Sequence, residues 1–285
     1  MTNISQDAPL KPIFIHVHVP KCGGTSLNKL LNAWFNGGME WIYFPDPKRI
    51  LTVNEMEDLV RRNPNINCIT SHHVRLFPPV IAGRPALYLT FLRQPADYCI
   101  SSARHAIQTQ REMSSEHRAL QPKNLEELSV VGLIQHWILE EEKDVFVGAD
   151  FSRIFFEAAA IRLGVDPRKT VKSNEELRSI QNLIQAIAIT QLEHFFFVGD
   201  FANFSSEVLR LAGLLRALGI EARDVEIPWE RRSADRPFTS PEQERDIRET
   251  LTRLLPVDRS VYEYFANRVS SAGQETSGAS PATSN

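Results

Sequence analysis

The sequence predicts an α/β fold in which helices cover a central parallel sheet on both faces. Short, continuous apolar runs recur along the chain, and segments with helical spacing of apolar residues separate them. The clearest runs are Ile13–Val19 and Ala86–Phe91, which read as strands buried on both sides. No linker rich in proline, glycine or serine divides the body of the chain. One α/β domain with a helical insertion is therefore the simplest architecture.

Strands and helices alternate through the first half of the chain. An amphipathic helix follows the first apolar run, and the next helix has Asn54 as a plausible N-cap residue. A short strand follows the break at Pro64, and Pro95 stands near the start of a further helix. The predicted strands are Ile13–Val19, Cys68–Ser71 and Ala86–Phe91, and the predicted helices are Thr25–Phe35, Val53–Arg61 and Pro95–Gln110.

The second half is mainly helical. Ser240, Pro241 and Gln243 form a typical sequence for a helix start, and Gly219 is typical of a helix end. The polar segments 1–10 and 270–285 lack the apolar residues that a core requires, so we expect disordered ends around a folded domain of residues 11–269. The predicted helices are Leu125–Ser129, Gly132–Glu142, Asn174–Ile189, Ser205–Leu218, Ser240–Leu255 and Val257–Val269, with one late strand at Phe195–Val198.

The overall composition excludes several classes of protein. The formal net charge over 285 residues is −3, so no global basic field indicates a nucleic-acid partner. No apolar run approaches the about 20 residues of a membrane span, and the N-terminus does not resemble a signal peptide. The spacing of Cys22, Cys68 and Cys99 argues against a disulfide framework and a zinc site. We expect a cytoplasmic protein, and the oligomeric state stays open.

The turn after the first strand is suited to binding a phosphate. Lys21 supplies a positive charge, and Gly23 and Gly24 let the backbone approach an anion where a helix begins. Thr25 and Ser26 add hydroxyl donors. The lysine precedes the glycines, so the turn is not a Walker A loop. A plain strand–helix turn with an exposed lysine is the alternative, but the combination favours an anion site.

Polar residues also follow two other predicted strands. Arg93 comes directly after Leu92, and Ser101 lies about two turns into the next helix, so the pair could hold one phosphate from two directions. A structural arginine is the alternative. His72 and His73 follow the short strand, and a histidine there could act as a general base, although a structural role is about as common.

His16 and His18 point to one face of the first strand. Their spacing could suit a metal, but no acidic residue or cysteine accompanies them. We favour core or hydrogen-bonding roles for both.

Together, these motifs resemble the sulfotransferases that use 3′-phosphoadenosine 5′-phosphosulfate (PAPS). The similarity is greatest to the branch of carbohydrate 2-O-sulfotransferases and their bacterial relatives, and it spans about residues 12 to 268. Arg93-x-Pro95 with Ser101 resembles the family's 3′-phosphate motif, and Ser71-His72 resembles the Gly-His pair that carries the catalytic base. The residues that resemble the family's 5′-phosphosulfate loop are Lys21, Cys22, Gly23, Gly24, Thr25 and Ser26.

The resemblance implies a P-loop-like three-layer fold and a metal-free sulfuryl transfer from PAPS to an acceptor hydroxyl, which leaves PAP as the product. His72 would take the acceptor proton and Lys21 would stabilise the leaving phosphate. The adenine would lie near residues 229–233. The acceptor would be a carbohydrate, a glycolipid or a small metabolite, and the choice between His72 and His73 as the base stays open.

Two other functions remain possible from the sequence. An ATP-dependent small-molecule kinase would need a magnesium carboxylate, for which Asp200 is the obvious candidate at a strand end. A catalytically inactive nucleotide-binding interaction module would tolerate Ser71 in place of the family's glycine.

Overall fold

The computed structural model describes residues 11–46, 49–112, 131–135, 154–155, 174–223 and 240–275, with backbone only at 110–112, 174–180 and 269–275. The chain folds into two compact units. Of the described residues, the first unit contains 11–92 and 191–223, and the second contains the others. Among the described residues, no helix has both the length and the apolarity that crossing a bilayer requires.

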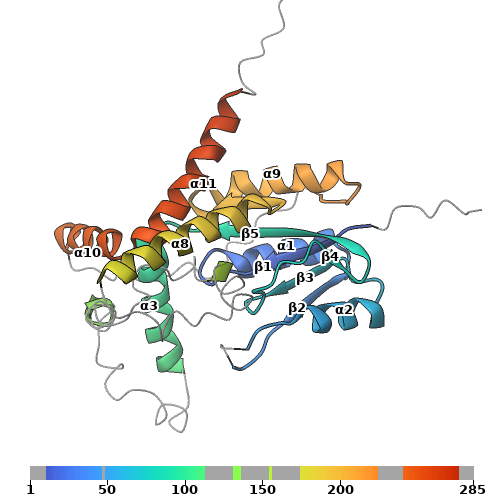
Figure 1. The fold of residues 1–285 in the computed structure, drawn as a ribbon, viewed down its shortest axis with the longest axis horizontal. Helices are drawn as coiled ribbons and strands as arrows, with labels where there is room; N and C mark the ends of the chain where they lie inside the picture. The colour runs from blue at the N-terminus through green and yellow to red at the C-terminus, as the bar shows by residue number, and fades with distance from the viewer. Residues whose placement is uncertain are drawn as a thin grey trace, which may run out of the picture. The chain divides into compact units, whose positions relative to one another are not determined.

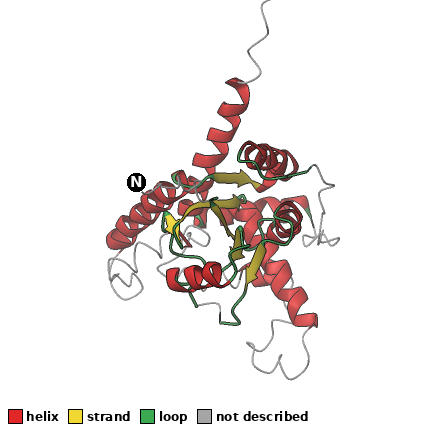
Figure 2. Ribbon diagram, turned by 90° about the vertical axis from the view of Figure 1, so that its right-hand side faces the viewer, coloured by secondary structure: helices red, strands yellow, loops and turns green. Residues whose placement is uncertain are grey.

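A mainly parallel sheet forms the centre of the first unit, as the sequence predicts. The strand order is β2-β3-β1-β5-β4, and β6 pairs with β5 (Figure 1). Only the β4–β5 pair is antiparallel among these strands. Figure 2 shows the strands fanned out as a twisted sheet. The strands are β1 (Ile13–Val17), β2 (Met39–Ile42), β3 (Cys68–Ser71), β4 (Val80–Ile81), β5 (Arg84–Leu92) and β6 (Phe197–Asp200).

Three helices and a short 3₁₀ turn complete the described part of the first unit. The helix α1 (Gly24–Trp34) covers the face of the sheet on which His16 lies, because its Asn28 side chain bonds that histidine. The aromatic rings of Phe91 in β5 and Phe204 at the start of α9 pack 5.0 Å apart. The remaining bounds are α2 (Val53–Arg62), η2 (Phe201–Asn203) and α9 (Phe204–Ala217).

The register of the parallel strands places three residues in one row. His16 of β1 and Trp41 of β2 both lie opposite Thr70 of β3. Because side chains alternate between faces, the residues two positions further along β1 and β3 belong to the same face. This alternation brings His18 and His72 together at the edge where both strands end.

The side chain of Arg84 fixes the opposite edge of the sheet. Its guanidinium donates to the carbonyl oxygens of Lys11, Pro12 and Ile66 at 2.8, 2.9 and 2.6 Å, and to Asn67 Oδ1 at 2.7 Å. Arg84 is itself buried. The start of β5 is thus bonded to the segments that lead into β1 and β3, which holds the three strands in register.

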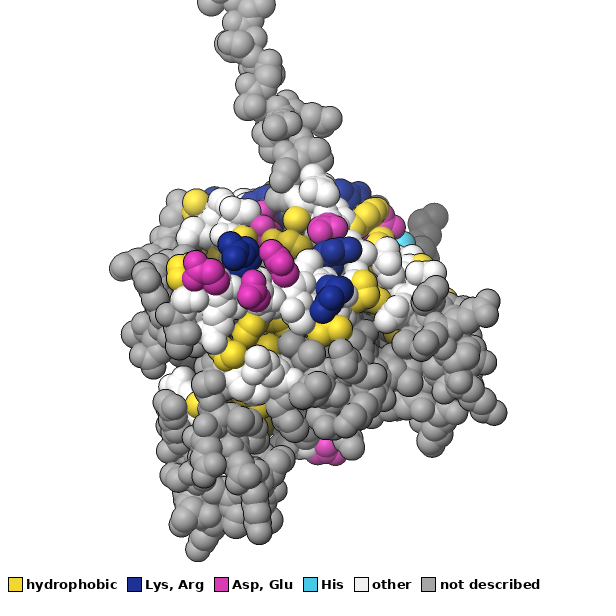
Figure 3. All heavy atoms as spheres, turned by 90° about the vertical axis from the view of Figure 1, so that its left-hand side faces the viewer, with side chains coloured by type: hydrophobic (Ala, Val, Ile, Leu, Met, Phe, Trp, Pro, Cys, Tyr) yellow, Lys and Arg dark blue, Asp and Glu magenta, His cyan; other side chains and the backbone are white. Residues whose placement is uncertain are grey.

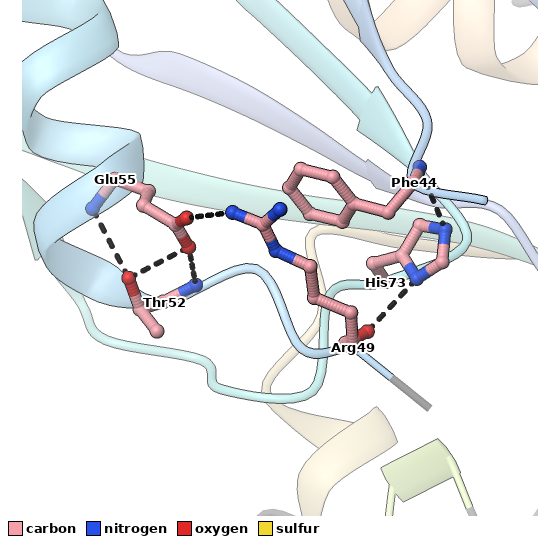
Figure 4. A network of polar contacts seen from close by, with 5 residues as sticks. All are labelled: Phe44, Arg49, Thr52, Glu55 and His73. Atoms are coloured by element: carbon pink, nitrogen blue, oxygen red, sulfur yellow. Dashed lines mark hydrogen bonds and ion pairs between the residues drawn. The ribbon is translucent and has the colours of Figure 1, made fainter. Parts of the chain in front are cut away.

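Helix ends confirm two sequence predictions and correct a third. Ser240 accepts a hydrogen bond from the Gln243 N–H, and Gly219 has a left-handed backbone with φ 78° after α9. The N-cap of α2 is Thr52 and not Asn54. The Thr52 hydroxyl accepts from the Glu55 N–H, and the Glu55 carboxylate accepts from the Thr52 N–H, which is a capping box (Figure 4).

Several predicted boundaries were wrong by a few residues. The first strand ends at Val17 and the late strand begins at Phe197, while the helix predicted as Asn174–Ile189 continues to Glu193. The short strands β2 and β4 were not predicted. Of the predicted helix Gly132–Glu142, residues 132–135 are helical, as predicted. Its other residues lie outside the described part of the chain, as do Leu125–Ser129 and the loop 229–233.

Four long helices contribute to the described part of the second unit, which also has short helical pieces at 131–135 and 154–155. Buried apolar side chains of α3, α10 and residues 131–134 form its core, and Asp97 of α3 accepts a 2.6 Å bond from Arg248 of α10. The last helix continues past the predicted domain end at residue 269. The bounds are α3 (Pro95–Glu112), α8 (Asn174–Glu193, whose last three residues belong to the first unit), α10 (Pro241–Leu254) and α11 (Pro256–Glu275).

Charges of both signs mix on the surface of the second unit. Acidic and basic side chains are interspersed on the face in Figure 3. The described residues of α10 and α11 line a shallow hollow of about 660 Å³ that carries Glu244 and Glu249 beside Arg245, Arg253 and Arg259. No field of a single sign results at this hollow.

Replacing Arg84 by methionine removes a buried cation and leaves four oxygen acceptors without their donor. Because bonds to a charged donor contribute about 1.5–3 kcal/mol each and are not additive, we expect Arg84→Met to lower the free energy of unfolding by about 3 kcal/mol or more. Urea denaturation measures this loss.

The control is Arg62→Met. The Arg62 side chain is 82% exposed and its ion pair spans 4.0 Å, so we expect the free energy of unfolding to change by no more than about 0.5 kcal/mol. Equal effects of the two substitutions would contradict the role of Arg84.

Candidate functional site

The turn between β1 and α1 has an unusual backbone. Lys21 and Gly23 both adopt left-handed conformations, with φ 62° and 76°. Such a conformation is strained for lysine, and strained residues of this kind cluster at binding and catalytic sites. The sequence prediction that this turn lies at the carboxyl end of a buried strand is confirmed.

The start of α1 has no side-chain cap. Its N-cap is Gly23, which has no side chain to cap the first N–H groups, and its first turn contains no acidic residue. By contrast, Thr52 caps α2 and Ser240 caps α10. An uncapped helix start carries partial positive charge, so this turn suits a phosphate or sulfate group. Lys21 is half-buried, Thr25 is exposed, and Cys22 and Ser26 are buried.

The two glycines leave space that other side chains fill. A Cβ atom on Gly24 would lie 1.7 Å from Nε2 of His18, and one on Gly23 would lie 2.6 Å from the ring of Phe201. The ring of His18 therefore packs directly beneath the first residue of α1. Any larger residue at position 24 would displace that ring.

His16, His18 and His72 form a row of packed imidazole rings, which we call the histidine row. His16 holds this row from within the core. Thr70 Oγ1 donates to Asn28 Oδ1 at 2.9 Å, and His16 Nδ1 lies 2.8 Å from the Thr70 hydroxyl and 3.0 Å from Asn28 Oδ1. Since the Thr70 proton is used on Asn28, both oxygens accept from His16 Nδ1–H. Burial lowers the pKa of His16 to about 3, so this ring stays neutral. The predicted hydrogen-bonding role of His16 is confirmed.

His18 lies between two other imidazoles. Its ring stacks on His16 at 5.2 Å and packs at a tilted angle against His72 at 3.9 Å, and Trp41 packs edge-on against it at 5.2 Å. His18 Nδ1 is buried and has no hydrogen-bond partner among the described residues. Burial above all, with the charges of His16, His72 and Lys21 adding to it, holds the pKa of His18 well below 6.5.

His72 has the geometry of a general base. Its Nδ1 donates to the carbonyl oxygen of His18 at 2.7 Å, because a carbonyl can only accept. In the neutral ring this bond leaves the lone pair on Nε2. Burial lowers the pKa of His72, although the bond to the His18 carbonyl opposes the shift, and the nearby charges of His73, Arg75 and Lys21 lower it further. A neutral imidazole at neutral pH can take a proton.

His73 has both ring nitrogens bonded to backbone groups. Its Nδ1 donates to the Arg49 carbonyl at 2.8 Å, and its Nε2 accepts from the Phe44 N–H at 3.2 Å (Figure 4). The residue is buried. His73 therefore connects the loop before α2 to the end of β3, and its nitrogens are not available to a ligand in this arrangement. The geometry favours His72 as the base.

The predicted 3′-phosphate residues belong to the second unit. Arg93 follows Leu92, the last residue of β5, and Ser101 lies in the second turn of α3. Both side chains are partly exposed. Gln94 caps this helix, because its Oε1 accepts from the Asp97 N–H at 2.9 Å. That Arg93 and Ser101 bind the same ligand as the Lys21 turn stays a prediction.

Asp200 does not have the arrangement of a metal ligand. Its Oδ1 accepts from the Ala202 N–H and its Oδ2 accepts from the Asn203 side chain, both at 2.9 Å, so its carboxylate caps η2. In the part of the chain that the structure describes, no three histidine, cysteine, aspartate or glutamate side chains form a group that could hold a metal ion.

Three residues of this site were not predicted from the sequence. Asn28 and Thr70 orient His16, and Trp41 packs against both His18 and His72. The alternation of Thr70 and His72 along β3 was a readable signal, since it puts both on one face. Trp41 lies on an edge strand that was not predicted.

No protein-family model and no curated protein matches this sequence. Among solved structures, the chain is similar to a sulfotransferase from Alicyclobacillus acidocaldarius. The sequence identity is 18%, the alignment covers 90% of this chain and 96% of that chain, and the TM-score is 0.46.

Replacing Gly24 by alanine tests the packing of His18. The new Cβ would occupy the position of the imidazole, so we expect Gly24→Ala to lower the free energy of unfolding by about 1–3 kcal/mol. In a His18→Ala variant the imidazole no longer fills this space. Gly24→Ala should therefore lower the free energy of unfolding by at least about 0.5 kcal/mol less in that variant than in the wild-type protein. The matched control is Gly213→Ala in α9, where a Cβ would meet nothing within 4 Å and alanine should stabilise the helix. Additive effects of the His18 and Gly24 substitutions would contradict the contact.

The buried histidines predict a loss of stability in mild acid. Their pKa values are lower in the folded chain than the 6.5 of the unfolded chain, so the unfolded state binds more protons below pH 6.5. Stability is complete above pH 6.5 and falls as the pH drops, by up to about 1.4 kcal/mol per pH unit for each histidine. Urea denaturation between pH 6.5 and about 5 measures the slope. His16→Gln should reduce the slope, whereas substitution of the exposed His194 is the control.

Proposed function

We propose that this protein is a sulfotransferase that moves the sulfuryl group of PAPS to an acceptor hydroxyl and releases PAP. The observation that carries the proposal is the position of the His18 ring between the candidate phosphate turn and the candidate base. A Cβ atom on Gly24 would lie 1.7 Å from His18 Nε2, and the centroids of the His18 and His72 rings are 3.9 Å apart, so the turn and His72 lie at the same edge of the sheet. A cation for the leaving group and a neutral base for the acceptor are the two groups that this transfer requires.

The donor would bind with its 5′-phosphosulfate over the turn from Lys21 to Ser26. The uncapped N–H groups at the start of α1 and the Lys21 ammonium would neutralise this end of the donor. The 3′-phosphate would bind to Arg93 and Ser101, in keeping with the resemblance of these residues to the 3′-phosphate motif of PAPS-dependent enzymes. Arginine suits this role because its planar guanidinium can donate two parallel bonds to one phosphate.

The transfer is a displacement at sulfur. The acceptor oxygen would attack the sulfur as His72 Nε2 takes its proton, and the bond from sulfur to the bridging phosphate oxygen would break. The electron pair of that bond stays with the phosphate, whose growing charge Lys21 would stabilise. The Nδ1 bond to the His18 carbonyl holds the His72 ring in the tautomer that this step needs. The proposed scheme uses no metal.

The chemistry fits a reducing compartment. Cys22, Cys68 and Cys99 are buried and none of them forms a disulfide, which favours a cytoplasmic reaction and a cytoplasmic acceptor. A carbohydrate is the acceptor that the resemblance to carbohydrate 2-O-sulfotransferases favours.

Substitution of His72 separates catalysis from donor binding. Loss of a positioned base costs about 100- to 10,000-fold in rate, so His72→Ala should lower kcat by this factor while the Kd for PAP stays nearly unchanged. Arg93→Ala should instead weaken PAP binding, because it removes a phosphate ligand. Transfer from ³⁵S-labelled PAPS and calorimetric titration with PAP measure the two effects.

The neighbouring histidine supplies the control. His73→Ala should lower thermal stability, because it removes two bonds to backbone groups, but the folded fraction should keep most of its kcat. If His73→Ala alone abolishes turnover, or if the His72 and Arg93 variants lose PAP binding equally, the assigned roles are wrong. Absence of PAP binding to the wild-type protein would overturn the proposed function itself.

A further inference from the structure

Two aromatic side chains lie exposed beside the histidine row. Among the described residues, Trp41 is 39% exposed and Tyr43 is 62% exposed, and the other large apolar side chains with comparable exposure are aliphatic. Trp41 belongs to the edge strand β2, and Tyr43 follows the end of that strand by one residue. Exposure of a large aromatic surface is costly in water, so a pair at one place indicates a binding surface.

The position of Trp41 connects this surface to the reaction. Its indole ring packs edge-on against His72, with ring centroids 5.7 Å apart, and at a similar angle against His18. Tyr43 contacts His73 at 5.9 Å. A molecule that covers Trp41 would therefore lie next to the proposed base, which is where the acceptor must be.

The surroundings of the two rings indicate which acceptor fits. Neither ring lies in an enclosed pocket, because 39% of Trp41 and 62% of Tyr43 is exposed. A small apolar or aromatic alcohol would need an enclosed pocket that removes most of its surface from water. A pyranose ring has C–H groups on its faces and hydroxyls around its rim, so it can stack on an exposed indole while its hydroxyls stay hydrated.

Polar groups lie in the loop that follows Tyr43 in the chain. Arg49 packs its guanidinium over the Phe44 ring at 3.7 Å and is half-exposed, and Asp46 is exposed in the same loop. These groups can meet rim hydroxyls of a bound sugar but offer nothing to a purely apolar ligand.

We propose that Trp41 and Tyr43 form a stacking platform for a pyranose ring, whose hydroxyl receives the sulfuryl group at His72. This inference rests on the proposed sulfuryl transfer. Trp41 would bind the ring that carries the reacting hydroxyl, because it touches His72. Tyr43 would extend the platform toward the next sugar of the acceptor.

The test compares binding of simple glycosides to the full chain in the presence of PAP. The probes are the methyl glycosides of glucose, galactose, mannose and N-acetylglucosamine, with the open-chain polyol sorbitol and with phenol as comparisons. Saturation-transfer NMR reports which protons contact the protein. We expect signals from ring C–H groups of at least one glycoside, no comparable signal from sorbitol, and a several-fold loss in Trp41→Ala. Trp41→Phe should retain part of the signal.

Kinetics with the bound glycoside as acceptor give a second readout. Trp41→Ala should raise the acceptor KM about tenfold and change kcat less, while the Kd for PAP stays within twofold. The matched control is Leu209→Ala, which truncates a side chain of the same unit that is 54% exposed in α9, and it should leave all three values unchanged.

The remaining outcomes overturn the platform. They are no signal from any glycoside, equal signals from sorbitol, a signal from phenol alone, or glycoside binding that Trp41→Ala does not weaken. Failure of the wild-type protein to bind PAP would instead refute the proposed function, and the glycoside signals would still decide whether the platform exists.

Discussion

The packing of the His18 ring against Gly24 is the contact on which the candidate site depends. It joins the residue that follows β1 to the first residue of α1, so the candidate anion-binding turn is packed directly against His18. The same residue accepts the Nδ1 proton of His72 through its backbone carbonyl, and its ring packs against the His72 ring at a tilted angle. One residue thus supports the turn that would hold the donor and orients the group that would activate the acceptor. The requirement for glycine at position 24 follows from this packing.

Burial of three imidazoles carries a thermodynamic cost that is consistent with a catalytic role. His16, His18 and His72 all have lowered pKa values, and removal from water is the first cause in each case. A core of aliphatic side chains would be more stable in acid. A row of neutral imidazoles next to Lys21, however, keeps a base available in the presence of a cation, which an exposed histidine would not achieve as well. His18 Nδ1, buried without a partner among the described residues, is a further departure from what stability alone would favour.

The sequence predicted the parts of the fold that are buried on both faces. The strands β1 and β5 lie mostly on apolar runs, all four residues of β3 are buried, and β3 has the predicted bounds. The edge strand β2 reads Met-Glu-Trp-Ile and is only partly buried, so it has no such run, and Trp41 was missed with it. The N-cap of α2 was assigned to the wrong residue, although Thr52 and Glu55 have capping-box spacing in the sequence. His72 and His73 could not be separated from the sequence, because only the direction of each side chain shows which one is bonded to the backbone on both nitrogens. The relation of Arg93 and Ser101 to Lys21 depends on how the chain continues from β5 into the second unit, which no local pattern encodes.

The strand order gives the proposed reaction a spatial direction. Trp41 lies on β2, His72 follows β3, the Lys21 turn follows β1, and β5 leads to Arg93. Neighbouring strands are about 4.8 Å apart, so acceptor platform, base and phosphosulfate turn would succeed one another in steps of roughly that length. In the proposed transfer, the reacting hydroxyl would lie between His72 Nε2, which takes its proton, and the sulfur that it attacks. Among the described strands, β2 pairs only with β3, so a residue on β2 can face both solvent and the end of β3. The edge position of β2 is therefore what allows Trp41 to be both exposed and in contact with the proposed base.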